Sequence, residues 1–392
     1  MNLQLSTRVQ SIKPSPTLAV TNRAAELRAA GQDIIGLGAG EPDFDTPQHI
    51  KDAAIDAISN GFTKYTAVDG TPALKNAIIN KFKNDNGLDY QANQILVSCG
   101  GKQSFFNLSL ALLNPGDEVV IPAPYWVSYP DMVKIAEGVP VVIETNAEAR
   151  FKITAEQLDA AITEKTKLVV LNSPSNPSGM AYSKAEFAAL GEVLRKYPNV
   201  IIATDDMYEH ILWTEESFSN ILTVNPDLYE RTIVLNGVSK AYSMTGWRIG
   251  YAAGPQPLIG AMKKIQSQST SNPTSIAQVA AQAAIEGDQE CVKDMVKVFK
   301  QRHDYMVKAL NEIDGIECLA GDGTFYVFPD FSGMQTKLGC ATDTDLAEKL
   351  LEAGVALVPG SAFGTPDHMR ISFATSDENL QKSIERLKAA LA

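Results

Sequence analysis

The chain has 392 residues, of which 45% are hydrophobic and 20% are charged. This length exceeds what one core of ordinary size needs and predicts two domains. The formal net charge is −12, which argues against a nucleic-acid or anionic-membrane partner. Anionic small molecules are not excluded, because net charge does not report on a local basic pocket.

The cysteines and the N-terminal segment predict a cytoplasmic, soluble protein without a metal site. Cys99, Cys291, Cys318 and Cys340 are too widely spaced for a CxxC pair, and isolated reduced thiols are typical of the cytoplasm. The N-terminal MNLQLSTRVQSIKPSP lacks the apolar stretch of a secretory signal. No apolar run in the chain approaches the length of a membrane span.

In the middle of the chain, apolar runs typical of strands alternate with helical patterns. Seven runs are predicted as strands: QILVS (94–98), EVVIP (118–122), PVVIE (140–144), KLVVLN (167–172), NVIIATD (199–205), TIVLN (232–236) and RIGYAAG (248–254). Most are continuously apolar, as expected for strands covered on both faces. Thr154 with Gln157, and Ser183 with Glu186, fit capping boxes at two helix starts. The pattern predicts an α/β fold with a mainly parallel sheet and helices on both faces.

The last hundred residues predict a smaller α+β domain. Its predicted elements are a long helix from about Ser275 to Leu310, strands at IECLA (316–320) and TFYVFPD (324–330), a helix at 342–354, a strand pair and a last helix at 375–391. We expect a large domain at 48–290 and a small domain at 291–392. The N-terminal arm and helix, residues 1–47, are expected to join the small domain.

The segment SKAYSMTGWRIG (239–250) follows a predicted strand and holds the first candidate site residues. A desolvated Lys240 amine would be a nucleophile for aldehydes, and Arg248 has the planar fork that suits a phosphate. The alternative for both is a solvated surface charge. Gly246 and Trp247, which lie between these two residues in the sequence, argue against a plain surface loop and favour the functional interpretation.

Three further segments after predicted strands carry candidate residues. In TDDMYEH (204–210), the Asp205 carboxylate could keep a pyridine nitrogen protonated and Tyr208 could donate to a ring oxygen, although such residues can also cap helices. NSPSNPSG (172–179) is a turn that would present the Asn176 amide. SCGGKQS (98–104) places glycines at a helix start, where N–H groups bind phosphate, but it is neither a P-loop nor GxGxxG.

In their order along the chain, these segments resemble the fold-type I pyridoxal-phosphate (PLP) aminotransferases, in particular the bacterial aspartate aminotransferase subgroup. The resemblance spans essentially the whole chain and is carried by GAGEPDFDTP (38–47), KYT (64–66), GGKQ (100–103), PYWVSYP (124–130), NSPSNPSG, the Asp205–Tyr208 pair, SKAYSMTGWRIGYAAG (239–254) and MRISFATS (369–376).

The resemblance implies PLP as the cofactor and a role for each matching residue. Lys240 would form the Schiff base and carry the proton between Cα and C4′, with Asp205 and Tyr208 completing the catalytic set. The ring and the phosphate would be held by the remaining cofactor residues: Asn176, Trp126, Gly101, Lys102, Ser239, Arg248 and, from the neighbouring subunit, Tyr65. Many relatives have a serine where this chain has Gly237, so one phosphate contact is expected to be missing or replaced by Ser239 or by the neighbouring subunit.

For the substrate, the resemblance implies that Arg370 clamps the α-carboxylate with help from Asn176, Trp126 and the Gly40 backbone. The distal carboxylate of a dicarboxylic donor has no obvious arginine. The candidates for it are Lys13, Ser15, Thr17 and Lys102. Structural alternatives exist for several residues: Trp126 as plain core, Tyr65 as a surface aromatic, Arg370 as a solvent-facing strand residue and Lys13 as a solvated charge.

The expected reaction is ping-pong amino transfer from aspartate to 2-oxoglutarate, giving oxaloacetate and glutamate, in a homodimer. Prephenate is a second expected substrate of the same class. Two alternatives are another fold-type I enzyme, such as a C–S lyase, and a non-enzymatic cofactor-binding module of a regulator. The acidic charge and the lack of an appended DNA-binding segment argue against the regulator.

Overall fold

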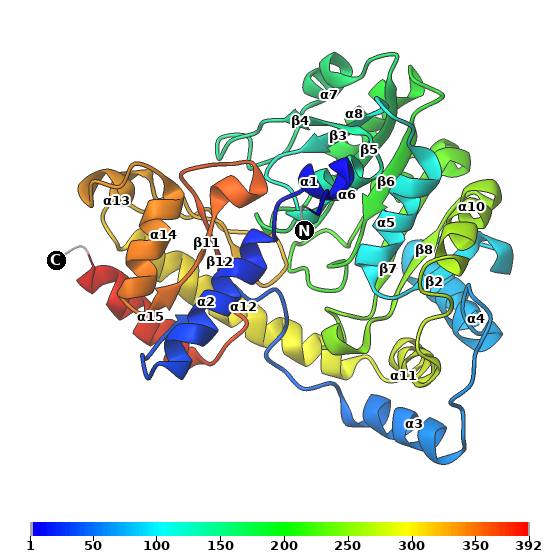
Figure 1. Cartoon of the computed structure of the whole chain (residues 1–392), viewed down its shortest axis with the longest axis horizontal. Coiled ribbons are helices and arrows are strands. Elements are labelled where there is room, and N and C mark those ends of the chain that lie inside the picture. Colours follow the sequence, from blue (N-terminus) through cyan, green and yellow to red (C-terminus); the bar gives the residue numbers. More distant parts are fainter. Residues whose placement is uncertain (1–2, 391–392) are drawn as a thin grey trace.

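The computed structural model describes residues 3–390. Residues 1–2 and 391–392, including the last residue of the predicted C-terminal helix, lie outside the described residues. The larger part is built on a seven-stranded sheet (Figure 1). Its strands, in spatial order, are β2 (Ile95–Ser98), β8 (Gly250–Ala253), β7 (Thr232–Gly237), β6 (Ile201–Asp205), β5 (Thr166–Asn172), β3 (Glu118–Pro122) and β4 (Val139–Ile143). They correspond to the seven predicted runs, and all are parallel except β8, which is antiparallel to β2 and β7.

Helices cover both faces of this sheet, because alternate side chains of each strand enter different apolar cores. In β3, Val119 and Ile121 belong to one core and Val120 to another. The first face is covered by α5 (Gly101–Leu112), α6 (Ser128–Ile135) and α10 (Gln256–Ser267). The opposite face is covered by α3 (Gln48–Ser59), α4 (Pro72–Lys81), α7 (Ala155–Ala161), α8 (Lys184–Arg195), the short α9 (Ile221–Val224) and α11 (Ser275–Glu286). The predicted capping boxes are present at the starts of α7 and α8.

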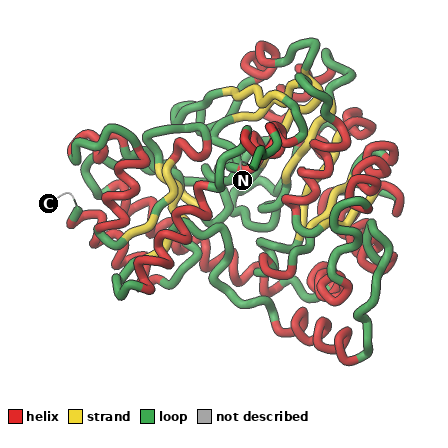
Figure 2. The backbone as a smooth tube through the Cα atoms, in the orientation of Figure 1, coloured by secondary structure: helices red, strands yellow, loops and turns green. Residues whose placement is uncertain are grey.

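The smaller part of the structure, which combines N-terminal and C-terminal segments, holds two small sheets beside the large one (Figure 2). β1 (Ile35–Gly36) pairs in parallel with β10 (Val355–Ala356), and β12 (Met369–Ser372) lies between β11 (Val358–Pro359) and β9 (Tyr326–Val327). The helices of this part are α2 (Pro16–Ala29), α12 (Glu290–Asn311), α13 (Ser332–Lys337), α14 (Asp343–Glu352) and α15 (Asp377–Ala389). The domain boundaries at residues 47 and 290 stay predictions.

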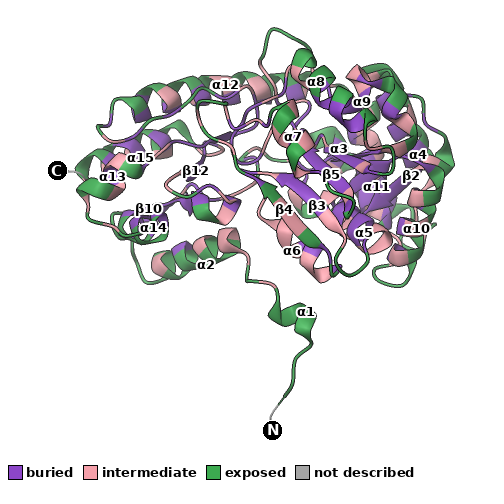
Figure 3. Cartoon of the chain, turned by 90° about the horizontal axis from the view of Figure 1, so that it is seen from above, coloured by how far each residue is buried: buried purple, intermediate pink, exposed green. Residues whose placement is uncertain are grey.

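The N-terminal arm is mostly exposed and contacts the larger part at α6. Its one short helix, α1 (Thr7–Gln10), has no buried residue and extends away from the body (Figure 3). Arg8 on this helix forms an exposed ion pair with Glu137 at the end of α6. None of the helices between residues 3 and 390 combines the length and apolar character that a membrane span needs.

Three predicted elements were wrong in detail. The helix predicted from Ser275 to Leu310 is two helices, because Gly287 ends α11 in an extended conformation; a Cβ there would lie 2.6 Å from the Ala283 carbonyl oxygen. IECLA forms no strand beyond one bridge between Glu317 and Asp330. The last predicted strand of the large sheet begins at Gly250 rather than at Arg248, whose φ of 58° turns the chain before β8.

Gly250 brings β8 against the start of α5 more closely than any other residue allows. A Cβ at this position would lie 2.2 Å from the Gly101 nitrogen and 2.5 Å from the Gly100 carbonyl carbon. Since both obstacles are backbone, neither can rotate away. This contact sets the distance between β8 and the N-terminus of α5.

We therefore expect Gly250→Ala to lower the free energy of unfolding by about 1–3 kcal/mol, the usual cost of overpacking. The matched control is Gly260→Ala in α10, where a Cβ meets nothing within 4 Å. Since alanine is the better helix former, this control should be neutral or stabilising by up to about 1 kcal/mol. Thermal and urea unfolding of both variants test this. An equal effect of the two substitutions would contradict the account of Gly250.

Candidate functional site

The carboxyl ends of β5, β6 and β7 open into one cleft with an empty volume of about 1030 Å³. Open α/β sheets bind their ligands at this edge. The cleft is lined by Ser15, Thr17, Leu18, Gly40, Gly101, Lys102, Trp126, Val127, Ser128, Asn172, Asn176, Asp205, Met207, Tyr208, Ser239, Lys240, Thr245, Arg248, Tyr326 and Arg370. Its charged side chains are four cations and one carboxylate. An acidic protein therefore has a basic cleft, which suits an anionic ligand.

Lys240 follows β7 and lies half-buried in the cleft, so it is not a surface charge. Its Nζ donates to the Gly40 carbonyl oxygen at 2.5 Å. Burial and the nearby positive charges of Arg370 and Arg248 lower the pKa of Lys240 to about 8, against the opposing effects of Glu41 and Asp205. A large fraction of neutral amine is thus present at mildly alkaline pH, as nucleophilic or base chemistry requires.

Asp205 ends β6 and is the carboxylate of the cleft. Its Oδ2 accepts a hydrogen bond from the Tyr129 hydroxyl at 2.5 Å, and its Oδ1 accepts from the Met207 amide at 3.2 Å. Burial raises the pKa of Asp205, while the Tyr129 and Met207 hydrogen bonds and the charge of Lys240 act in the opposite direction. A partly desolvated carboxylate held in this way is suited to pair with a cationic ring nitrogen.

Tyr208 lies one turn beyond Asp205 and is buried. Its hydroxyl is 3.1 Å from the Tyr326 hydroxyl of β9. The Lys240 Nζ lies 6.0 Å from the centre of the Tyr208 ring. Asp205 and Tyr208, predicted from one segment, and Lys240, predicted from another, therefore line one cleft.

The start of α5 and the Arg248 side chain form an anion-binding subsite within the cleft. Gly101 and Lys102 are the first residues of α5, so their N–H groups have no acceptor within the helix. Arg248 donates to the carbonyl oxygens of Thr245 and Cys99, which holds its guanidinium against this helix end. Gly100 has a φ of 87°, a conformation that favours glycine, and a Cβ there would also lie 2.5 Å from the Arg248 Nη2. The arrangement suits a phosphate group.

Arg370 is only 2% exposed, which excludes the solvent-facing alternative. Its Nη1 donates to the Asn176 Oδ1 at 3.0 Å and its Nη2 to the Gly38 carbonyl oxygen at 2.7 Å. Its Nε has no hydrogen-bond partner among residues 3–390. A buried guanidinium with an unused donor is the expected partner of a carboxylate.

A hydrogen-bonded chain ties this clamp to Asp205. The Asn172 Oδ1 accepts from the Asn176 amide, and the Asn172 Nδ2 donates to the Asp205 carbonyl oxygen, both at 2.9 Å. Asn176 is thereby fixed between the strand end and Arg370. Neither Asn172 nor its part in this chain was anticipated from the sequence.

The residues predicted to bind the distal carboxylate of the substrate line two neighbouring pockets. Ser15, Thr17 and Lys102 line the cleft, and the Lys102 Nζ lies 5.2 Å from the centre of the Trp126 ring. Lys13 lines an adjoining pocket that shares Ser15 and Lys102 with the cleft. Partial burial and the charge of Arg248 lower the pKa of Lys102.

Two further predicted cofactor residues differ in position. Tyr65 does not line the cleft and is 92% exposed in a single chain. Ser239 lines the cleft and is buried. Gly237 has little room for a larger residue, since a Cβ would lie 3.0 Å from the Gly250 Cα and 3.1 Å from the Ile249 carbonyl oxygen. The tight approach of β8 accounts for this glycine.

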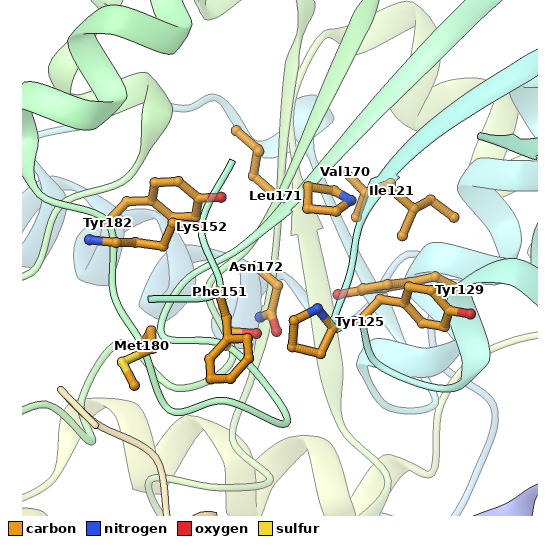
Figure 4. A pocket seen from close by; sticks show the side chains of 13 residues that line it. Ile121, Tyr125, Tyr129, Phe151, Lys152, Val170, Leu171, Asn172, Met180 and Tyr182 are labelled. Atoms are coloured by element: carbon orange, nitrogen blue, oxygen red, sulfur yellow. The ribbon is translucent and has the colours of Figure 1, made fainter. Parts of the chain in front are cut away.

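Sequence reasoning did not identify Tyr129 and Tyr326. Tyr129 follows Trp126 by three residues and packs edge-on against it, with ring centres 5.2 Å apart. With Asn172 it also borders a second, narrower pocket of mostly apolar and aromatic side chains (Figure 4). The spacing to Trp126 was a usable signal for Tyr129. Tyr326 stands among apolar residues of a short strand, and nothing in that pattern marks it.

Comparison with known proteins agrees with this geometry. A family model described as aminotransferase class I and II matches residues 32–387. The chain is 61% identical to an aspartate/prephenate aminotransferase from Nitrosomonas europaea over 100% of both chains. It is 51% identical to the crystal structure of the aspartate aminotransferase from Rhizobium meliloti, with a TM-score of 0.95 over 100% of this chain and 99% of that one. The aspartate aminotransferase from Thermus thermophilus with maleate is 44% identical, with a TM-score of 0.93 over 99% and 100%.

The matched range includes every cleft residue from Gly40 to Arg370, and two independent comparisons cover nearly the full chain. The chain belongs to the class I and II aminotransferase family.

Proposed function

We propose that this protein is a PLP-dependent aspartate aminotransferase that transfers the amino group of aspartate to 2-oxoglutarate. The observation that carries the proposal is the convergence of Lys240, Asp205, Arg248 and Arg370 on one cleft. PLP supplies, when bound, an aldehyde that receives the amino group and a ring that accepts the electron pair released at the substrate Cα. The names of the relatives support aspartate as the donor.

The residues of the cleft fit PLP in each of its parts. Lys240 would hold the aldehyde, and the Asp205 carboxylate would pair with the ring nitrogen. Tyr208 and Asn176 would donate to the ring oxygen, and Trp126 would lie on the ring face. The phosphate would be held by the α5 amides of Gly101 and Lys102 together with Ser239 and Arg248. The glycine at position 100 and the free amides of α5 support the phosphate position.

After its release from the cofactor, the Lys240 amine would be the base that takes the proton from the substrate Cα and returns it at C4′ of the cofactor. Its lowered pKa favours this role, because an amine with an ordinary pKa would stay charged at neutral pH. Arg370 holds the α-carboxylate and so fixes the Cα within reach of Lys240. The unused Nε of Arg370 supports this assignment.

We further propose a cytoplasmic homodimer in which Tyr65 reaches the phosphate of the neighbouring subunit. The support is its exposure of 92% in a single chain, which is unusual for an aromatic side chain without a partner.

Prephenate is a second candidate substrate, supported by the names of the relatives at 61% and 56% identity. Measured transfer of an amino group from aspartate to 2-oxoglutarate, and to prephenate, separates these activities from a C–S lyase, which transfers no amino group to a 2-oxo acid.

Lys240→Ala should reduce steady-state turnover by at least about 10³-fold, because both the covalent attachment and the base are lost. Cofactor binding should persist, since the ring and phosphate contacts come from other residues. The measurements are aspartate turnover, bound PLP after ultrafiltration, and covalent labelling after borohydride reduction. Lys308→Ala on the exposed face of α12 is the control. Retained borohydride-dependent labelling in Lys240→Ala would identify a different lysine.

Asp205→Ala should lower kcat on the order of 10² to 10³-fold with a smaller change in KM, because the carboxylate matters most when charge moves onto the ring. Asp205→Glu keeps the charge and should recover part of the loss. Steady-state kinetics with aspartate and bound-PLP measurements test this. A raised KM at unchanged kcat would refute the assigned role.

Lys102→Ala should reduce kcat/KM about tenfold to a hundredfold for aspartate, glutamate and prephenate, and should barely affect alanine or phenylalanine, which lack a distal carboxylate. Lys13→Ala should act in the same direction but more weakly, since Lys13 lines only the adjoining pocket. Because the pKa of Lys102 is lowered, the preference for acidic donors should weaken at alkaline pH earlier than for an ordinary lysine. Equal losses on acidic and neutral donors would assign both lysines to phosphate binding or folding.

A further inference from the structure

Tyr326 stands between the two halves of the proposed site. It lies on β9, is 0% exposed, and lines the cleft beside Arg370 and Tyr208. Its ring lies beneath the Arg370 guanidinium, with 4.5 Å from the Arg370 Cζ to the ring centre. Its hydroxyl is 3.1 Å from the Tyr208 hydroxyl. One side chain thus contacts both the residue proposed for the substrate carboxylate and a residue proposed for the cofactor ring.

The two hydroxyls have only each other as hydrogen-bond partners within residues 3–390. Each phenol carries one proton, so only one of them can donate in this contact. If Tyr208 donated to Tyr326, the Tyr326 proton would have no acceptor among residues 3–390, and the Tyr208 proton would be unavailable to the ring oxygen proposed as its acceptor. If Tyr326 donates to Tyr208, the Tyr208 proton is free for an acceptor in the cleft.

We propose that Tyr326 is a positioning residue whose hydroxyl donates to the Tyr208 oxygen and thereby directs the Tyr208 proton to the ring oxygen of the bound cofactor. The inference rests on the proposed function, which supplies that ring oxygen. The order from Tyr326 to Tyr208 to the ring oxygen satisfies both buried phenol protons. It also strengthens the second hydrogen bond, because a hydroxyl that accepts a hydrogen bond is a better donor.

The Arg370 guanidinium favours this order. A positive charge above the ring makes the Tyr326 hydroxyl a stronger donor, and it opposes the effect of burial, which raises the pKa of Tyr326. The charged groups that act on Tyr208 and Tyr326 are Arg370, Asp205, Lys240 and Glu41. Of the cations near the two hydroxyls, Arg370 stacks on Tyr326, whereas Lys240 lies over the Tyr208 ring.

The test is a pH titration of the visible absorbance of the PLP-loaded enzyme for wild type, Tyr326→Phe, Tyr208→Phe and the double variant. A hydrogen bond to the ring oxygen favours its deprotonated form, so losing it raises the pKa of the bound chromophore. Tyr208→Phe should give the larger shift. Tyr326→Phe, which keeps the ring beneath Arg370, should shift the protonation equilibrium in the same direction by about threefold.

In the double variant, the substitution of Tyr326 should add nothing, because Tyr326 acts only through the Tyr208 hydroxyl. Tyr251→Phe, a buried tyrosine outside the cleft, controls for the loss of a buried hydroxyl and should leave the titration unchanged. An unchanged titration in Tyr326→Phe, or an equal additional shift in the double variant, would overturn the inference alone. An unchanged titration in Tyr208→Phe, or a wild type that binds no PLP, would instead overturn the proposed cofactor contacts, and this inference with them.

Discussion

The chemistry of the site depends on the amine of Lys240, which lies in a cleft that disfavours its positive charge. Burial removes the water that would solvate its proton, Arg370 and Arg248 repel that proton, and together these effects outweigh the attraction of Glu41 and Asp205. The same two arginines are the groups best suited to bind a carboxylate and a phosphate. An anionic ligand bound to these arginines would reduce their repulsion of the Lys240 proton. Ligand binding and the proton affinity of Lys240 are therefore coupled.

The fold assembles these charges from distant parts of the chain. Asp205 and Asn172 lie at the ends of neighbouring parallel strands, and the sheet delivers both to one edge. Arg370 and Tyr326 come from the three-stranded sheet of the other part. The antiparallel strand β8 completes the arrangement, since the approach of Gly250 to Gly101 brings the start of α5 to the edge where Lys240 emerges.

The sequence predicted the parts of this arrangement that follow from local pattern. Continuous apolar runs identified all strands of the large sheet, and the family motifs led to the charged residues that line the cleft. Features that depend on contacts between distant segments were missed. The break at Gly287 reflects the Ala283 carbonyl and His49, and the importance of Tyr326 reflects its neighbours Tyr208 and Arg370. Tyr65 does not line the cleft of its own chain, and the group that it is proposed to bind belongs to another subunit.

The pairing of β1 with β10 joins residues 35 and 36 to residues 355 and 356, near opposite ends of the chain. During synthesis the large sheet and the helices that cover it can form once residue 286 has left the ribosome, whereas β1 must wait for a partner that is made about three hundred residues later. The carbonyl groups of Gly38 and Gly40, which hold Arg370 and Lys240, lie just beyond β1. A nascent chain therefore has its central sheet well before it has a working cleft, and truncation near the C-terminus would leave a folded sheet without a substrate clamp.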